Sequence, residues 1–118
     1  MRLEIEEYIN NNYDIIQEHP WKDYPNHTTF KHKHNKKWFG LIMDVPYEKL
    51  HIDKEGNVDV INLKNIPEMI GGLRKEAGIL PAYHMNKEHW ISVLLDGTVP
   101  KNTIYNLIDI SYDLTRSK

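Results

Sequence analysis

The sequence of 118 residues predicts an α+β fold with a mostly antiparallel sheet of about five strands. Apolar residues recur at helical spacing near both ends of the chain, and capping signals mark a further helix in between. Short apolar segments, separated by tight-turn signals, fill the rest of the sequence and favour hairpins. Strands and helices do not alternate regularly, so a parallel α/β sheet is not indicated.

The first predicted element is an amphipathic helix over residues 3–18. Ile5, Ile9 and Ile16 follow the three-to-four residue spacing of one apolar helix face, and acidic side chains occupy the other face. Pro20 ends the segment, because a proline disfavours helical backbone in the residue before it.

Two strands are predicted next, over residues 28–33 and 36–45, with a tight turn at His34 and Asn35. Alternation divides the second strand into two faces, with Trp38, Gly40 and Ile42 on one and Phe39, Leu41 and Met43 on the other. Apolar residues on both faces predict a central strand that is covered on both sides. Pro46 ends this strand.

A second pair of strands is predicted over residues 49–52 and 58–63, because the dipeptide at 56–57 is a Gly-Asn hairpin signal. A last strand of buried character follows at residues 90–95. These segments bring the expected number of strands to about five.

A central helix is predicted over residues 66–77, with Asn65 as its N-cap and Gly78 as its C-cap. Gly71–Gly72 lies inside this segment, where each glycine costs roughly 1 kcal/mol relative to alanine. Close packing on a neighbour, or a break, would account for the two glycines. A C-terminal helix is predicted over residues 100–116.

The composition bounds the class of protein. Lys and Arg number 15 against 17 Asp and Glu, a net charge of −2 with neutral histidines. The absence of cysteine excludes a disulfide scaffold, a thiolate metal site and a cysteine nucleophile, and it fits a reducing compartment. No apolar run approaches the ~20 residues of a membrane span. We therefore expect one cytoplasmic domain over residues 1–118.

The charges are arranged in blocks along the chain. Residues 1–19 carry one Arg and five carboxylates, residues 22–37 carry five Lys and one Asp, and residues 44–59 carry two Lys and five carboxylates. Alternating blocks can simply keep a small protein soluble. A local anion-binding face in the basic block is the sharper hypothesis.

The densest polar cluster, residues 81–90, does not predict catalysis. His84 and His89 are five apart and would diverge on a helix, so they do not match a helical zinc site. No nucleophile, carboxylate pair or phosphate-binding loop accompanies them. His32 and His34 share a strand face, a pattern that does not by itself indicate a metal site. We expect neither an enzyme nor a metal or cofactor site.

The basic hairpin is the strongest binding candidate. It carries four lysines around its turn, Lys31, Lys33, Lys36 and Lys37. Such a hairpin can lie along a phosphate backbone. The alternative is an edge hairpin that lysines protect against sheet-to-sheet aggregation.

A protein- or small-ligand-binding module is the second hypothesis. It rests on the aromatic residues Trp21, Tyr24, Tyr83 and Trp90, which could line a pocket beside the sheet. Aromatic residues that only fill the core are the alternative.

Several short motifs carry a family resemblance. They are Lys37-Trp38-Phe39, Asn62-Leu63-Lys64 running to Pro67, Tyr83-His84-Met85-Asn86-Lys87 followed by His89-Trp90, and Ser111-Tyr112-Asp113-Leu114. The sequence resembles the MmcQ/YjbR-like proteins, small bacterial domains predicted to bind DNA through a double-wing motif. The likeness spans nearly the whole chain.

The resemblance implies an α+β domain with a curved antiparallel sheet, and it implies DNA binding. With the basic hairpin, it predicts a non-catalytic DNA-binding protein that contacts phosphates through Lys31, Lys33, Lys36 and Lys37, with Lys22, Arg74 and Lys87 as further contacts. Because the net charge is −2, binding to duplex DNA should be local, weak and salt-sensitive. We expect a monomer, with an unknown protein as a further possible partner.

Overall fold

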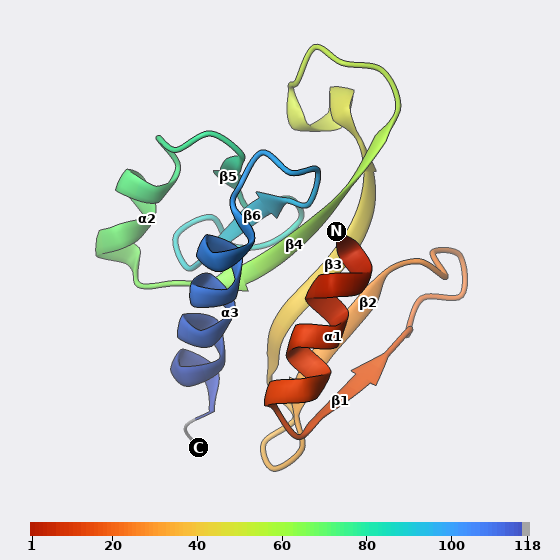
Figure 1. The fold of residues 1–118 in the computed structure, drawn as a ribbon, viewed down its shortest axis with the longest axis vertical. Coiled ribbons are helices and arrows are strands. Elements are labelled where there is room, and N and C mark those ends of the chain that lie inside the picture. The colour runs from red at the N-terminus through yellow and green to blue at the C-terminus, as the bar shows by residue number, and fades with distance from the viewer. Residues whose placement is uncertain (117–118) are drawn as a thin grey trace.

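Helices pack against one face of a six-stranded antiparallel sheet (Figure 1). A computed structural model describes residues 1–116. The helices are α1 (Arg2–Asn12), α2 (Pro67–Leu73) and α3 (Lys101–Thr115), with a 3₁₀ turn η1 (Tyr47–Leu50). The strands are β1 (Ile15–Glu18), β2 (Thr28–His32), β3 (Trp38–Pro46), β4 (Asn57–Lys64), β5 (Ile79–Pro81) and β6 (Trp90–Leu94). Their spatial order is β1-β2-β3-β4-β6-β5.

This arrangement confirms the α+β class and the antiparallel sheet, with six strands where about five were predicted. The two predicted strands on either side of the basic turn and the C-terminal helix are confirmed with small shifts at their ends. No helix in the described part of the chain is long and apolar enough to cross a membrane.

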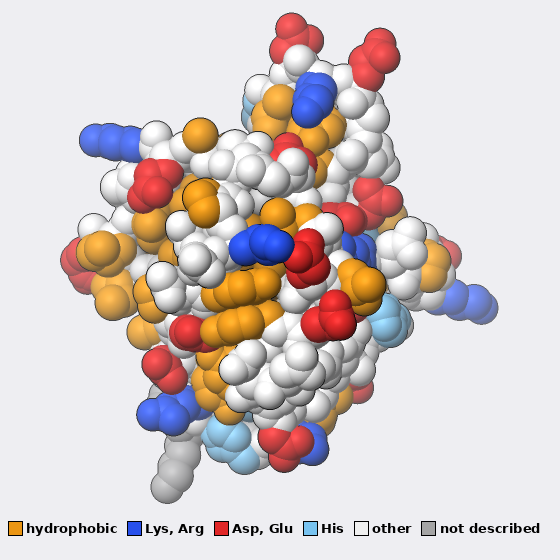
Figure 2. Space-filling model, viewed as in Figure 1, with side chains coloured by type: hydrophobic (Ala, Val, Ile, Leu, Met, Phe, Trp, Pro, Cys, Tyr) orange, Lys and Arg blue, Asp and Glu red, His pale blue; other side chains and the backbone are white. Residues whose placement is uncertain are grey.

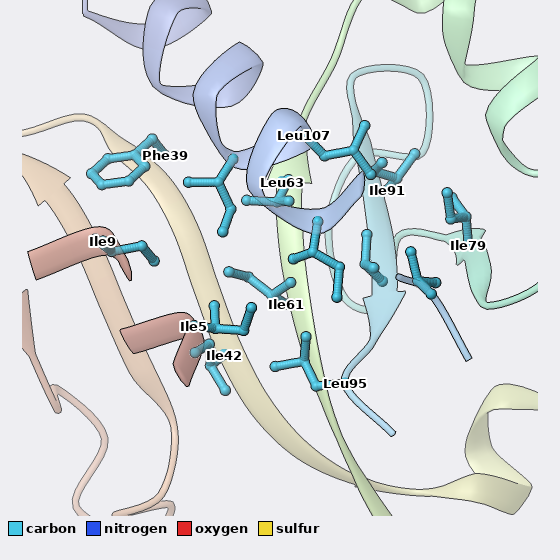
Figure 3. Close-up of a cluster of buried hydrophobic side chains, with 14 of the residues drawn as sticks. Ile5, Ile9, Phe39, Ile42, Ile61, Leu63, Ile79, Ile91, Leu95 and Leu107 are labelled. Carbon is cyan, nitrogen blue, oxygen red and sulfur yellow. The ribbon is translucent and has the colours of Figure 1, made fainter. Parts of the chain in front are cut away.

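The main core lies between the sheet and helices α1 and α3. Ile5 and Ile9 project from α1 and are completely buried, and Leu107 projects from α3. These side chains meet Ile61 and Leu63 of the central strand β4 (Figure 3). The helices therefore cover one face of the sheet by hydrophobic burial.

Two tyrosine stacks join α1 and its C-cap residue, Tyr13, to α3. The rings of Tyr8 and Tyr105 lie 4.0 Å apart, and those of Tyr13 and Tyr112 lie 3.9 Å apart. Tyr8 donates to Asp109 at 2.9 and 3.0 Å, and Tyr13 donates to the same carboxylate. Burial, followed by the hydrogen bond to Asp109, raises the pKa of Tyr8 to about 12. The aspartate thus receives two hydroxyl donors at the helix–helix interface.

The N-terminal helix is shorter than predicted. It ends at Asn12, and the segment at residues 15–18 is strand β1 rather than a last helical turn. Three consecutive asparagines at residues 10–12 have low helix propensity, and Tyr13 adopts extended backbone with φ −135°. Residues 15–18 instead pair with β2, and this pairing could not be predicted from the local sequence pattern.

The predicted pairing of residues 49–52 with residues 58–63 is wrong. Residues 49–52 are not a strand, because β4 pairs with β3 along its length, from Gly40 opposite Leu63 to Pro46 opposite Asn57. The chain between these two strands contains η1 and an exposed loop. Strand β5 was not predicted, since three residues are too few to give a periodic signal.

The central helix also differs from the prediction. It ends at Leu73, directly after Gly71–Gly72, and the N-cap position is Ile66 rather than Asn65. A methyl group added at either of these glycines would contact nothing within 4 Å, so a break and not close packing accounts for them. Gly78 is not a C-cap. It has φ +86°, and a Cβ there would lie 2.6 Å from Val99.

Strand β3 contains a bulge at Phe39. Phe30 of β2 lies opposite Gly40, but the next residue, Lys31, lies opposite Trp38. Phe39 therefore has no residue opposite it on β2. Phe39 and Ile42 both lie in the core beneath the helices, whereas Trp38 and Leu41 pack on the opposite face. The predicted faces are therefore wrong for Trp38 and Phe39, because an inserted residue interrupts strict alternation.

On its other side, toward β4, the bulged residue Phe39 is bonded by the hydroxyl of Ser111 on α3. This hydroxyl donates to the carbonyl of Phe39 at 2.6 Å and accepts from the backbone N–H of Lys64 at 2.9 Å. These backbone groups would face each other if the pairing of Gly40 with Leu63 continued by one residue. Ser111 thus ends the β3–β4 ladder and ties α3 to both central strands.

Replacing Ser111 should test this bridge. In Ser111→Ala, two backbone groups lose their partner beneath α3, which should lower the free energy of unfolding by about 1–3 kcal/mol. Urea unfolding measures this change. Asn106→Ala, an exposed position on the same helix, should stay within about 0.5 kcal/mol of the wild type. Equal midpoints for the two variants would contradict the bridge.

Candidate functional site

The sheet face opposite α1 and α3 is hollowed by a pocket of about 550 Å³. Its floor is formed by the buried side chains Leu41, Met43 and Val45 of β3. The complete lining is Trp21, Tyr24, His27, Trp38, Leu41, Met43, Asp44, Val45, Pro46, Lys49, Tyr83, His84 and Met85. Loops and η1 form its walls, so this face carries a concave site where the other face carries helices.

Three aromatic side chains converge on the pocket from distant parts of the sequence. Trp21 lies in the β1–β2 loop, Trp38 begins β3, and Tyr83 lies in the β5–β6 loop. The rings of Trp21 and Trp38 are 5.7 Å apart and meet edge to face at 76°. Trp38 reaches this face because the bulge at Phe39 shifts the alternation of β3.

The rim of the pocket is also aromatic. Tyr24 is 58% exposed, and its ring stacks on His27 at 4.9 Å. The structure thus places three of the four residues of the aromatic hypothesis, Trp21, Tyr24 and Tyr83, in one pocket. Trp90 is not among the lining residues.

A buried polar pair fixes the β5–β6 loop against the sheet. Asn62 on β4 donates to the carbonyl of Tyr83 at 2.9 Å, and Ser92 on β6 accepts from the N–H of Tyr83 at 2.8 Å. Ser92 also donates to the amide oxygen of Asn62 at 2.5 Å. Both groups are completely buried, so the wall of the pocket is held by satisfied hydrogen bonds.

The remaining motif residues of this loop differ in their exposure and contacts. His84 is exposed and has φ +60°, and it lines the pocket with Met85. The side chain of Asn86 accepts from the N–H of Glu88 at 2.8 Å and so stabilises the turn that leads into β6. Lys87 and His89 are exposed.

The lysines of the basic hairpin lie beside acidic residues of the N-terminal segment. Lys31 forms an ion pair with Glu18 at 2.9 Å, and Lys33 with Asp14 at 2.6 Å. Lys36 and Lys37 are exposed near the turn. On the helix-bearing side, Lys and Arg are interspersed with Asp and Glu, and no continuous basic face is seen in this view (Figure 2).

The other predicted phosphate contacts are not brought to the hairpin. Arg74 follows α2 and donates to the carbonyl of Lys87 at 3.5 Å. These two residues lie toward the β6–β5 side of the sheet, whereas the hairpin belongs to the β1–β2 side. Lys22 lies in the β1–β2 loop. The structure therefore separates the predicted DNA contacts into different regions.

The two hairpin histidines are hydrogen-bonded to the end of α3. His32 is buried, and its Nε2 lies 2.8 Å from the hydroxyl of Thr115. His34 is exposed, and its Nε2 lies 2.6 Å from the carbonyl oxygen of Arg116. Among the described residues, no group of three or more His, Asp or Glu side chains is placed to hold a metal ion.

The family model described as YjbR matches residues 4–114. The chain belongs to the YjbR family. This finding confirms the resemblance that the motifs suggested.

Relatives and solved structures agree with the family assignment. The uncharacterized Bacillus subtilis (strain 168) protein YyaQ is 47% identical over 115 residues, which cover 98% of each chain. The uncharacterized Escherichia coli (strain K12) protein YjbR is 42% identical over 57 residues, 48% of each chain. A crystal structure of a Pseudomonas syringae protein has a TM-score of 0.95 and 48% identity, covering 98% of this chain and 99% of that one.

A more distant solved structure shares the YjbR fold. A Deinococcus radiodurans protein with a DUF419 domain has a TM-score of 0.76 and 27% identity, covering 100% of this chain and 80% of that one. Because one fold can serve many functions, the function of this YjbR protein has to be argued from its own site.

The buried His32 should make stability pH-dependent. Burial, with the nearby His34 as a second cause, lowers the pKa of His32, so the folded state favours the neutral ring. As the pH falls below the ordinary histidine value of about 6.5, the unfolded chain binds a proton that the folded chain resists. The free energy of unfolding should therefore decrease between pH 7.5 and 5.5.

Urea unfolding at the two pH values measures this decrease, and NMR titration of the imidazole signals identifies the group. The decrease should become smaller in His32→Gln and stay unchanged in His89→Gln, which alters an exposed histidine. A His32 signal that titrates above the ordinary histidine value would contradict the prediction.

Proposed function

We propose that this YjbR-family protein is a non-catalytic binding module whose pocket takes a small organic ligand with an aromatic ring. The observation that carries the proposal is the aromatic lining of the concave sheet face, with Trp21, Trp38, Tyr24 and Tyr83 above a floor of β3 side chains. A volume of about 550 Å³ lies within the range of small-molecule sites. Edge-to-face and stacked contacts with such rings favour a planar partner.

The supports of the pocket favour binding without large rearrangement. Its floor residues Leu41, Met43 and Val45 are almost completely buried, and the wall at Tyr83 is fixed by Asn62 and Ser92. A site that is formed before binding loses less conformational entropy when the ligand enters.

Local binding of duplex DNA at the hairpin turn is a second candidate. It is supported by Lys33 and Lys36, which are exposed near the turn. Arg116 is also exposed, and it lies near the turn because His34 is hydrogen-bonded to its carbonyl oxygen. The ion pairs of Lys31 and Lys33 with acidic residues reduce the local positive charge. We therefore rank DNA binding below the aromatic pocket.

Titration with free indole tests the pocket. The chain has three tryptophans, and the indole N–H signals of Trp21 and Trp38 should shift saturably in NMR spectra, while that of Trp90 stays in place. For a ligand this small, a dissociation constant of about 1 mM is expected. Tryptophan-to-phenylalanine variants assign the three signals.

Variants at the rim and outside the pocket complete this test. Tyr24→Ala removes an exposed ring from the rim and should weaken indole binding by about fivefold. Trp90→Phe lies outside the lining and should leave the affinity unchanged. If indole shifts all three signals equally, or none of them, the pocket is not an aromatic-ligand site.

A salt titration with duplex DNA tests the second candidate. Binding should be detected at low salt and should weaken as salt rises, because lysine–phosphate contacts release counterions. A plot of log affinity against log salt has a negative slope. Replacing Lys33 and Lys36 with Ala should make this slope less steep by about 1.8. The double variant Lys54→Ala/Lys75→Ala removes the same charge elsewhere. Absence of low-salt binding, or equal effects in both double variants, would reject DNA binding at the hairpin.

A further inference from the structure

We propose that the ligand of the pocket is a planar aromatic anion, whose ring lies among the aromatic side chains and whose carboxylate or phosphate is held by Lys49. This inference rests on the proposed function and specifies its ligand class. It is carried by the charges of the pocket lining, which includes two charged residues, Asp44 and Lys49.

The side chain of Asp44 belongs to the other face of the sheet. In the β3–β4 register, Asp44 lies opposite Asp59, next to the pair Met43 and Val60. Met43 and Val60 pack on the pocket side, so alternation directs both aspartates toward the helix side.

The environment of Asp59 supports this assignment. Asp59 forms an ion pair at 3.1 Å with Arg2 of α1, a helix that packs on the face opposite the pocket. Asp44, directly across the strand pair, lies on the same face. Asp44 therefore lines the pocket with its backbone and does not supply a carboxylate to it.

Lys49 has no carboxylate of the described residues within ion-pair distance. The ammonium groups of Lys31, Lys33 and Lys101 each lie within 3 Å of a carboxylate oxygen. Lys54, on the loop after η1, lies 5.0 Å from the ring of Tyr47. Lys49 instead projects from η1 at the edge of the pocket and is exposed, so it can reach a ligand there.

These charges decide between three classes of aromatic ligand. A cation would gain from the ring faces, but it would meet the Lys49 ammonium without a carboxylate side chain to balance it. A neutral ring would use the aromatic lining and leave Lys49 unengaged. An anion uses both features, because its ring enters the aromatic pocket and its charge meets the ammonium.

Two kinds of compound carry such an anionic group, and the same contacts would recognise both. A small aromatic acid supplies a carboxylate close to its ring, and a mononucleotide supplies a phosphate at a greater distance from its base. Indole-3-acetate represents the first source and AMP the second. Neutral indole and cationic tryptamine share the ring of indole-3-acetate, so charge is the main variable among these three compounds.

The experiment compares the dissociation constants of these four compounds by the shifts of the Trp21 and Trp38 signals at low salt. Because Lys49 is exposed, indole-3-acetate should bind about two- to fivefold more tightly than indole, and tryptamine more weakly than indole. AMP binding more tightly than indole-3-acetate would assign the phosphate source, and the reverse order would assign the carboxylate source. Either order supports an aromatic anion provided that the tighter anion binds more tightly than indole and tryptamine.

A charge reversal identifies the residue. Lys49→Glu should abolish the preference for indole-3-acetate over tryptamine. The matched variant Lys54→Glu, on the same connection but outside the pocket lining, should retain the preference.

The outcomes separate the two levels of the proposal. If indole does not bind, the proposed function fails and the ligand class fails with it. If indole binds but tryptamine binds as tightly as both anions, only the aromatic anion is rejected. If the anions are preferred equally in Lys49→Glu and the wild type, the assignment of Lys49 is overturned.

Discussion

The contact between Ser111 and the bulge at Phe39 is the constraint on which both faces of the sheet depend. One extra residue in β3 turns Phe39 toward the helices and Trp38 toward the opposite face. The Ser111 hydroxyl satisfies the carbonyl of Phe39 and the N–H of Lys64 at this point. Without Ser111 these two backbone groups would be left unpaired beneath α3, which is costly. The core and the pocket are therefore set by one structural feature.

The motif residues fall into two groups, buried polar side chains that hold the backbone and partly exposed aromatic side chains. Ser111 and the Asn62–Ser92 pair are buried polar groups that satisfy backbone atoms and fix neighbouring segments. The aromatic rings of Trp21 and Trp38 are instead partly exposed on a concave face. Burial therefore decides whether a polar or aromatic motif residue supports the backbone or faces the pocket.

The charge blocks acquire a different meaning in the folded chain. The acidic residues Asp14 and Glu18 lie on or beside β1, next to the basic strand β2, where they pair with Lys33 and Lys31. Partly exposed pairs of this kind contribute little to stability individually, but they reduce the positive charge offered to an external polyanion. Lys49 in the pocket lining is not neutralised in this way within the described residues.

The sequence by itself determined the α+β class, the hairpin between residues 28 and 45 and the C-terminal helix, because local periodicity and turn residues specify these elements. It also suggested the family and three aromatic residues of the pocket. Only the tertiary structure decided that residues 15–18 and 79–81 are strands, since such short segments become strands through their partners. The bulge at Phe39 and the meeting of Trp21, Trp38 and Lys49 likewise depend on contacts between segments far apart in the chain, which no local pattern encodes.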